Sequence, residues 1–181
     1  MELLALLPRI LDALDTEHVN YALVGGLASN LWVADEKVRE TFDIDFAVKG
    51  VWSPERVMEA LQSPAVSVLR GSDLNLSRAD ITRLILNDTI LDFVSAKSKE
   101  FMDSVFIRVR QGQAAGRNLP VVSAEDVFVF KALSKREIDM HPMCALAETS
   151  EFDREYVERW VRKLGVWSFA KRALPGYRRG R

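Results

Sequence analysis

The sequence predicts an α+β fold in which helices flank a mixed central sheet, with a helical part at the C-terminal end. Three observations predict it. Short apolar segments typical of strands occupy the first two thirds of the 181 residues, a few helical patterns lie among them, and helical patterns alone follow residue 123. No internal repeat or low-complexity linker is present. We therefore divide the chain into a core of residues 1–122 and a helical C-terminal region of residues 123–181 packed on that core.

Helices are expected where apolar residues recur every three or four positions. The segment up to about Asp15 has this spacing. Ser53 followed by Pro54 predicts a helix start, because serine caps the first turn and proline fits its first position. Ser123 with Asp126 three residues later predicts another capped start. The further helices are expected at 27–34, 53–61, 123–134, 139–149, 153–164 and 167–174.

Strands are expected in short segments rich in β-branched or apolar residues. Asn87 and Asp88 lie between two of them and predict a hairpin turn. The expected strands are 21–24, 42–48, 65–69, 81–86, 89–94, 106–109 and 119–122.

Composition narrows the class of protein. The chain is 48% hydrophobic and 28% charged, which is ordinary for a globular domain. The single cysteine, Cys144, excludes an internal disulfide framework and favours a reducing, cytoplasmic location. No apolar run is long enough to span a membrane, and the apolar opening segment lacks the features of a signal peptide.

Basic residues are concentrated near the C-terminus. From Arg159 to Arg181 there are eight lysines and arginines and no acid. Such a segment either contacts a polyanion or forms a solvated basic face. Trp160, Trp167 and Tyr177 lie among these residues, where they either stack on bases or, at helical spacing, belong to the core.

Asp43 and Asp45 carry the strongest chemical signal. Alternate residues of a strand point to one face, so Phe42, Ile44 and Phe46 are expected to face the core and the two acids to share the other surface, roughly 7 Å apart. Paired carboxylates repel unless a cation lies between them, and divalent metals bound in this way suit phosphoryl chemistry. The alternative is a solvent-facing strand with two ordinary acids.

Gly25 and Gly26 follow a predicted buried strand and precede a predicted helix. Backbone amides and a helix N-terminus then converge where no side chain obstructs, which is the outline of a phosphate cradle. The pattern is neither a Walker A loop nor a dinucleotide fingerprint. A glycine pair alone is equally typical of a tight turn, so its combination with the two acids is what favours phosphate binding.

The motifs together resemble the polymerase-β nucleotidyltransferase superfamily. Residues 24–28 (VGGLA) and 39–46 (RETFDIDF) are similar to its signature, and the R-x-T-x-D-I-D form is similar to the minimal nucleotidyltransferases of bacterial abortive-infection toxin systems. Residues 122–126 (VSAED), Lys131 and 136–139 (REID) are similar to a later helix of the family. The resemblance implies the nucleotidyltransferase fold.

The resemblance also implies roles for individual residues. Asp92, an acid within an apolar strand, would be the third carboxylate and with Asp43 and Asp45 would hold two Mg²⁺ ions, Mn²⁺ being the alternative. Lys131 would contact the triphosphate or acceptor, with a surface lysine as the alternative. Arg136 would pair with Asp139. The nucleotide-binding residues would be Gly25, Gly26, Ser29, Arg39, Thr41 and Arg136.

Two of these residues have a more specific expectation. Thr41 is expected to orient Asp43 through a hydrogen bond. Arg39 is expected to meet carboxylates or phosphates, or else to form a structural ion pair.

The implied reaction transfers a nucleoside monophosphate from an NTP, with ATP as one candidate, to a hydroxyl group. The acceptor would be an RNA, such as the 3′ end of a tRNA, or a protein, in a toxin–antitoxin system with a cognate antitoxin or toxin partner. Two alternatives stay open: transfer to a small aminoglycoside-like molecule, which acids in the acceptor cleft would favour, and a non-catalytic relative that binds a nucleotide or a partner.

Overall fold

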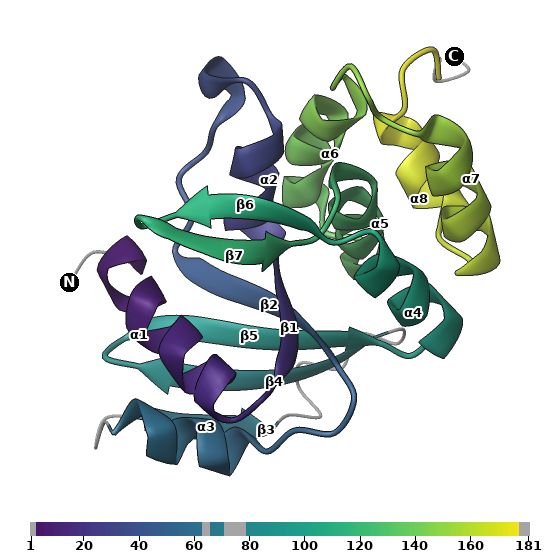
Figure 1. Ribbon diagram of the computed structural model, residues 1–181. Coiled ribbons are helices and arrows are strands. Elements are labelled where there is room, and N and C mark those ends of the chain that lie inside the picture. The colour runs from purple at the N-terminus through teal and green to yellow at the C-terminus, as the bar shows by residue number, and fades with distance from the viewer. Residues whose placement is uncertain (1–2, 63–65, 71–78, 178–181) are drawn as a thin grey trace.

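The computed structural model describes residues 3–62, 66–70 and 79–177. Its strands form one seven-stranded sheet with the order β3-β4-β5-β2-β1-β7-β6 (Figure 1). The pairs β1–β7 and β2–β5 are parallel and the other neighbours are antiparallel, so the sheet is mixed, as predicted. The strands are β1 (Asn20–Val24), β2 (Asp43–Lys49), β3 (Val66–Arg70), β4 (Ala79–Leu86), β5 (Thr89–Ala96), β6 (Arg110–Ala114) and β7 (Arg117–Val121).

Helices lie on two sides of the sheet. α1 packs against α3, whereas α2 packs against α5, which also contacts α6 and α7 (Figure 1). The α-helices are α1 (Leu3–Thr16), α2 (Gly25–Trp32), α3 (Pro54–Leu61), α4 (Lys99–Ile107), α5 (Ala124–Ser134), α6 (Met140–Ala147), α7 (Arg154–Lys163) and α8 (Trp167–Ala170). The 3₁₀ turns are η1 (Asp35–Lys37), η3 (Glu137–Asp139) and η4 (Lys171–Ala173). Within the described residues no helix is long and apolar enough to cross a membrane.

The predicted local signals form as expected. The Ser53 side chain accepts a hydrogen bond from the Arg56 amide at the start of α3, and Ser123 accepts one from the Asp126 amide at the start of α5. Asn87 and Asp88 join β4 to β5 with φ angles of +48° and +66°, which is the left-handed conformation that tight hairpins require. Capping and turn chemistry are local properties, which is why the sequence identifies them.

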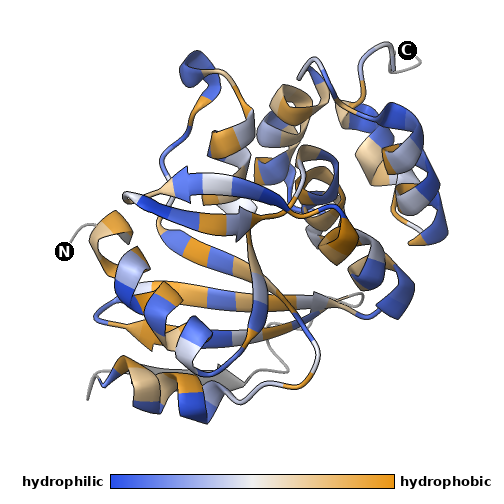
Figure 2. Cartoon of the chain, in the orientation of Figure 1, coloured by the Kyte–Doolittle hydropathy of each residue, from blue (hydrophilic) through white to orange (hydrophobic). Residues whose placement is uncertain are grey.

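The structure differs from the predicted elements at three places. Residues 106–109, predicted as a strand, contain the end of α4, whose start is capped by Ser98 and whose buried face includes Phe101 and Val105 at helical spacing. β6 was not predicted because its sequence, RQGQA, has no apolar alternation; it is a hydrophilic edge strand (Figure 2). The helix expected at 27–34 begins two residues earlier, at Gly25.

The basic C-terminal segment packs through its aromatic residues. Trp160 is 4% exposed and lies against Phe101, so the core interpretation is confirmed for it. Trp167 is partly buried, and the Arg162 guanidinium lies over its ring, 3.8 Å from the ring centre. Tyr177 remains partly exposed. Arg178, Arg179 and Arg181 lie outside the described residues.

Asp126 anchors α5 to α7 from a fully buried position. It accepts hydrogen bonds from the Tyr156 hydroxyl at 2.5 Å and from the Ser123 hydroxyl at 2.8 Å, and Arg108 Nε lies 3.6 Å away. Burial raises the pKa of Asp126 to about 6, although these three partners favour its charged form and only the nearby Glu125 adds to the rise. Folding therefore favours the neutral carboxyl group.

We expect Asp126→Asn to change how stability depends on pH. Because the folded-state pKa lies above the ordinary value, the stabilisation is complete below about pH 4 and is lost as pH rises through about 6. Between pH 5 and pH 7.5 the wild type should lose about 1 kcal/mol of unfolding free energy that the asparagine variant does not lose. Denaturant unfolding at both pH values measures this, with the exposed Asp80→Asn as control. A difference between the wild type and Asp126→Asn that stays constant with pH would contradict the expectation.

Candidate active site

Adjacent strands place charged residues in one row across the sheet. Asp45 on β2 lies opposite Asp92 on the parallel strand β5, and Asp92 lies opposite Arg83 on β4. On its other side Asp45 lies opposite Val24, the last residue of β1. Residues in register on neighbouring strands point to the same face with their Cβ atoms about 5 Å apart. The row therefore brings two carboxylates and a guanidinium together next to the turn that follows β1.

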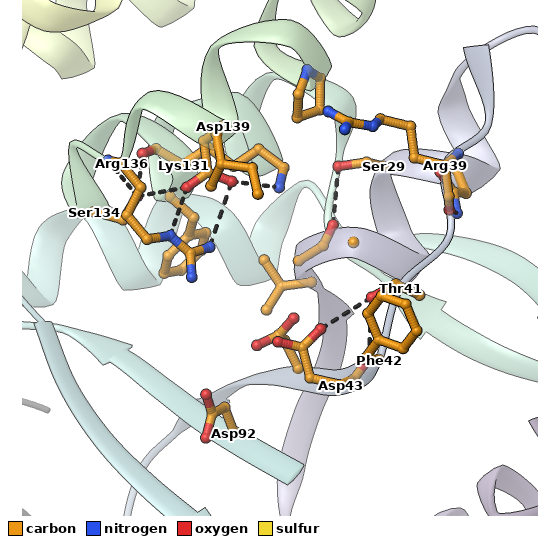
Figure 3. A pocket seen from close by; sticks show the side chains of 18 of the residues that line it. Ser29, Arg39, Thr41, Phe42, Asp43, Asp92, Lys131, Ser134, Arg136 and Asp139 are labelled. Carbon is orange, nitrogen blue, oxygen red and sulfur yellow. Dashed lines mark hydrogen bonds and ion pairs between the residues drawn. The ribbon is translucent and has the colours of Figure 1, made fainter. Parts of the chain in front are cut away.

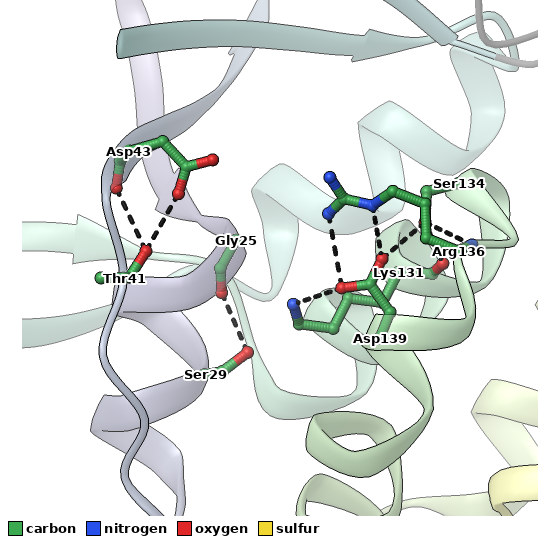
Figure 4. A network of polar contacts seen from close by, with 8 residues as sticks. All are labelled: Gly25, Ser29, Thr41, Asp43, Lys131, Ser134, Arg136 and Asp139. Atoms are coloured by element: carbon green, nitrogen blue, oxygen red, sulfur yellow. Dashed lines mark hydrogen bonds and ion pairs between the residues drawn. The ribbon is translucent and has the colours of Figure 1, made fainter. Parts of the chain in front are cut away.

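Asp43 joins this row from the start of β2. It is two residues before Asp45 and shares its face, as the alternation predicts. The Thr41 hydroxyl donates a hydrogen bond of 2.9 Å to Asp43 Oδ1, so the predicted orienting contact is present (Figure 4). Phe42 does not face the core as expected. It is 75% exposed because β2 begins only at Asp43, and its side chain lies at the cavity (Figure 3).

The glycine pair allows α2 to begin directly against these residues. Gly25 has φ of +71°, and a Cβ atom there would lie 1.8 Å from Asp45 Oδ2. A Cβ atom on Gly26 would lie 2.6 Å from Thr41 Oγ1. No side chain caps the N-terminus of α2, while the Ser29 hydroxyl donates to the Gly25 carbonyl oxygen at 2.9 Å. Glycine is thus required here for close approach to the acids as well as for the turn.

A cavity of about 900 Å³ opens above the row, within the size range of ligand sites. The predicted site residues all line it: Gly25, Gly26, Ser29, Arg39, Thr41, Asp43, Asp45, Asp92, Lys131 and Arg136. The sheet and α2 form one wall, and α5, η3 and α6 form the facing wall (Figure 3). Both ranges into which we divided the chain contribute, and none of the described residues after Ala145 takes part.

An ion-pair network around the buried Asp139 forms the facing wall, with Lys131 buried and the Arg136 side chain 62% exposed. Asp139 accepts hydrogen bonds from Lys131 Nζ at 3.1 Å, Arg136 Nε at 2.8 Å and Ser134 Oγ at 2.8 Å (Figure 4). The expected pair between Arg136 and Asp139 is therefore present. Lys131 is only 8% exposed, so the surface-lysine alternative was wrong. One carboxylate holds both cations toward the acid row.

Electrostatics distinguish the acids of the row. Enclosure in the protein, and then the charges of Asp43 and Asp92, raise the pKa of Asp45 to about 7, against the opposing effect of Lys131 and Arg136. Within the described part of the chain, Asp45 has no ion pair. Asp43 and Asp45 together offer oxygen donors of the kind that a divalent cation prefers.

Asp92 has a different environment. Arg83 Nε and Nη2 each donate to one of its carboxylate oxygens, at 2.7 Å. No three acidic, histidine or cysteine side chains in residues 3–62, 66–70 and 79–177 are arranged to hold a metal ion. Asp43, Asp45 and Asp92 nevertheless line one cavity, so the three-carboxylate metal site that the resemblance implies stays a prediction.

Arg39 lies at the cavity without a carboxylate partner among the described residues, so its structural ion-pair alternative is not observed. Its backbone is fixed by Asn30, whose side chain donates to the Arg39 carbonyl oxygen at 2.7 Å and accepts from its amide at 3.1 Å. Arg83 and Ser134 were missed by sequence reasoning. A strand pattern gives no pairing partner, so nothing in the sequence connected Arg83 with Asp92.

Comparison with known proteins identifies the fold. The sequence matches no protein-family model and no curated protein. The structure is similar to a crystal structure of ANT(2'')-Ia in complex with adenylyl-2''-tobramycin, with a TM-score of 0.55 and 15% identity over 93% of this chain and 97% of that chain. It is also similar to a solution structure of the antibiotic-resistance factor ANT(2'')-Ia, with a TM-score of 0.50 and 17% identity over 94% of this chain and 86% of that chain. At such identity the similarity shows the fold, and this chain has the nucleotidyltransferase fold.

Proposed function

We propose that this protein transfers a nucleoside monophosphate from an NTP to a hydroxyl group at the 3′ end of an RNA. The observation that carries the proposal is the row of Asp45 and Asp92, joined by Asp43, beneath a cavity entered by the N-terminus of α2. Clustered acids beside free helix amides suit a metal-bound triphosphate. The fold supports the same class of reaction.

The donor half of the reaction uses both walls of the cavity. Amides at the start of α2 would bind phosphate oxygens, since no side chain caps them. Lys131 and Arg136 would bind the triphosphate from the facing wall. Asp43 and Asp45 would hold Mg²⁺, or Mn²⁺ as the alternative ion. When bound, this ion would neutralise charge on the phosphates during the transfer.

The transfer step breaks one bond and forms one. The acceptor hydroxyl oxygen attacks the α-phosphorus, the bond from that phosphorus to the bridging oxygen of the β-phosphate breaks, and pyrophosphate leaves. The hydroxyl proton passes to a base, for which Asp92 is the candidate in the row when Arg83 does not hold it. Holding the reactants in line and compensating charge supply most of the acceleration in such sites.

The charges around the cavity favour RNA over a polycationic acceptor. Asp92 is bound by Arg83, Asp139 is bound by Lys131 and Arg136, and Asp43 and Asp45 are assigned to the metal. These acids are therefore not available to bind an aminoglycoside.

Groups at the cavity suit a nucleotide chain better. Val38, Phe42 and Ile138 are 49%, 75% and 70% exposed and line the same cavity as the basic Arg39. Exposed aromatic rings and basic side chains in one groove are typical of surfaces that bind single-stranded nucleic acid.

A small hydroxylated molecule is the second candidate acceptor. The similarity to ANT(2'')-Ia, solved with adenylyl-2''-tobramycin, favours it, and Glu40 is a cavity carboxylate to which we assign no partner. A non-catalytic role is less consistent with Asp43, Asp45 and Asp92 being gathered in one cavity, since buried like charges are costly to retain.

We expect the purified protein to transfer label from α-labelled NTPs to RNA in the presence of Mg²⁺. Asp43→Asn and Asp45→Asn should each lower the rate about 100-fold or more, because each removes a metal-binding charge. The control is Asp80→Asn, an exposed acid outside the cavity. The absence of both transfer and Asp43-dependent nucleotide binding would contradict the enzyme assignment.

The same reaction distinguishes the acceptors. Bulk RNA, total cell protein and tobramycin are supplied separately with the labelled NTPs. Label on RNA supports the proposal, whereas label on protein or tobramycin alone would replace RNA with that acceptor.

Gly25→Ala should lower transfer and nucleotide affinity about tenfold or more, because the added methyl group meets Asp45 while the αL backbone is strained. Gly116→Ala is the matched control, since Gly116 has φ of +72° against +71° at Gly25 but no atom within 4 Å of an added Cβ. Both variants should lose about 1 kcal/mol of stability from the backbone conformation. Equal transfer by the two variants would show that the close approach to Asp45 has no role.

A further inference from the structure

Arg83 and Asp92 form a two-contact ion pair on neighbouring strands. Nε donates to Oδ1 and Nη2 donates to Oδ2, both at 2.7 Å. The Asp92 side chain is 9% exposed and that of Arg83 is 25% exposed, so the pair is largely removed from water. Paired contacts of this kind fix orientation as well as charge. Both carboxylate oxygens of Asp92 are thereby engaged by one guanidinium.

The guanidinium also belongs to the wider acid cluster. The hydrogen bond with Asp92 raises the pKa of Arg83, and the charges of Asp92, Asp43 and Asp45 add to this effect. Arginine keeps its charge throughout the working range of pH, so Arg83 is a permanent cation at this end of the row. It supplies to Asp92 the compensating charge that a metal ion would otherwise supply.

A guanidinium and a divalent ion compete for Asp92. A metal ion would bind at about 2 Å from a carboxylate oxygen that already accepts a hydrogen bond from Arg83. Two cations bound to one carboxylate also repel each other strongly where bulk water does not screen them. Asp92 in this arrangement is a partner of Arg83 and is not an open ligand.

We propose that the Arg83 guanidinium binds the Asp92 carboxylate in place of a second metal ion. The substrate-free protein then holds one divalent ion, at Asp43 and Asp45. A second ion binds through Asp92 only when Arg83 leaves it. This rests on the proposed function, because it takes Asp43 and Asp45 as the metal-binding pair. Arg83 is a positioning residue here: it acts through Asp92 by controlling which cation that carboxylate meets.

The cavity offers Arg83 another partner when it leaves Asp92. Its side chain lines the cavity that the triphosphate would enter. A bound anion would attract the guanidinium and lower the cost of separating it from Asp92. Assembly of the second metal position would then be coupled to the arrival of the nucleotide, and Asp92 would be free to accept a proton only in that state.

Mn²⁺ binding without nucleotide tests the proposal. Electron paramagnetic resonance of free Mn²⁺ counts the bound ions across a titration. The wild type should bind one ion per chain in the titrated range. Arg83→Gln should bind a second ion, with an affinity for that second ion about tenfold or more above that of the wild type. Adding Asp92→Asn to Arg83→Gln should abolish that gain. Arg117→Gln is the matched control, because it breaks a surface ion pair with Asp12 at 2.8 Å and should leave Mn²⁺ binding unchanged.

The outcomes separate this proposal from the proposed function. Equal Mn²⁺ binding by the wild type and Arg83→Gln, or two ions already on the wild type, would overturn the role of Arg83. Loss of binding in Asp45→Asn would in that case still support the proposed metal pair. No Mn²⁺ binding by either protein would overturn both. If circular dichroism shows that Arg83→Gln does not fold, Arg83→Lys replaces it, and a smaller gain is expected because lysine cannot make the two parallel contacts.

Discussion

Negative charge gathered in one row of the sheet is the constraint on which the site depends. Asp45 and Asp92 are register partners on parallel strands, and Asp43 stands beside them on the same face. Each carboxylate loses favourable hydration there, and their mutual repulsion adds to that cost. Positive charge compensates the acids from two sides: Arg83 lies at one end of the row, and Lys131 and Arg136 lie on the facing wall. Among the described residues neither Asp43 nor Asp45 has an ion-pair partner, and burial raises the pKa of Asp45 to about 7.

The two walls of the cavity contribute different things. The sheet supplies acids because alternate strand residues share a face, and the glycine turn lets α2 begin against them without obstruction. The helices after residue 123 supply cations, and Asp139 fixes Lys131 and Arg136 in place by bonding to both. The proposed metal-bound triphosphate would follow this division, with its phosphates facing the cations and its metal facing the acids. In that arrangement the exposed Phe42 and Arg39 would remain for the proposed acceptor.

Local patterns predicted much of the fold. Alternation identified β2, serine caps identified the starts of α3 and α5, and Asn87 with Asp88 identified the hairpin. These succeeded because each is decided by interactions within a few residues. The predictions failed where tertiary packing, and not the local hydrophobic pattern, decided the secondary structure. Residues 106–109 have the composition of a strand, but they include the end of α4, which packs on the core through Phe101. β6 lacks an apolar pattern because it is an edge strand.

The sequence by itself determined that Asp43 and Asp45 share a face and that glycines join the strand to the next helix, because side-chain periodicity and glycine conformation are local properties. Only the tertiary structure decided that Asp45, Asp92 and Arg83 form one row, since strand order and register arise from packing between segments far apart in the chain. The same holds for Lys131, which the sequence left undecided and which is buried against Asp139. The acids, Lys131 and Arg136 were thus predicted from the sequence and the resemblance, whereas Arg83 was found only in the assembled sheet.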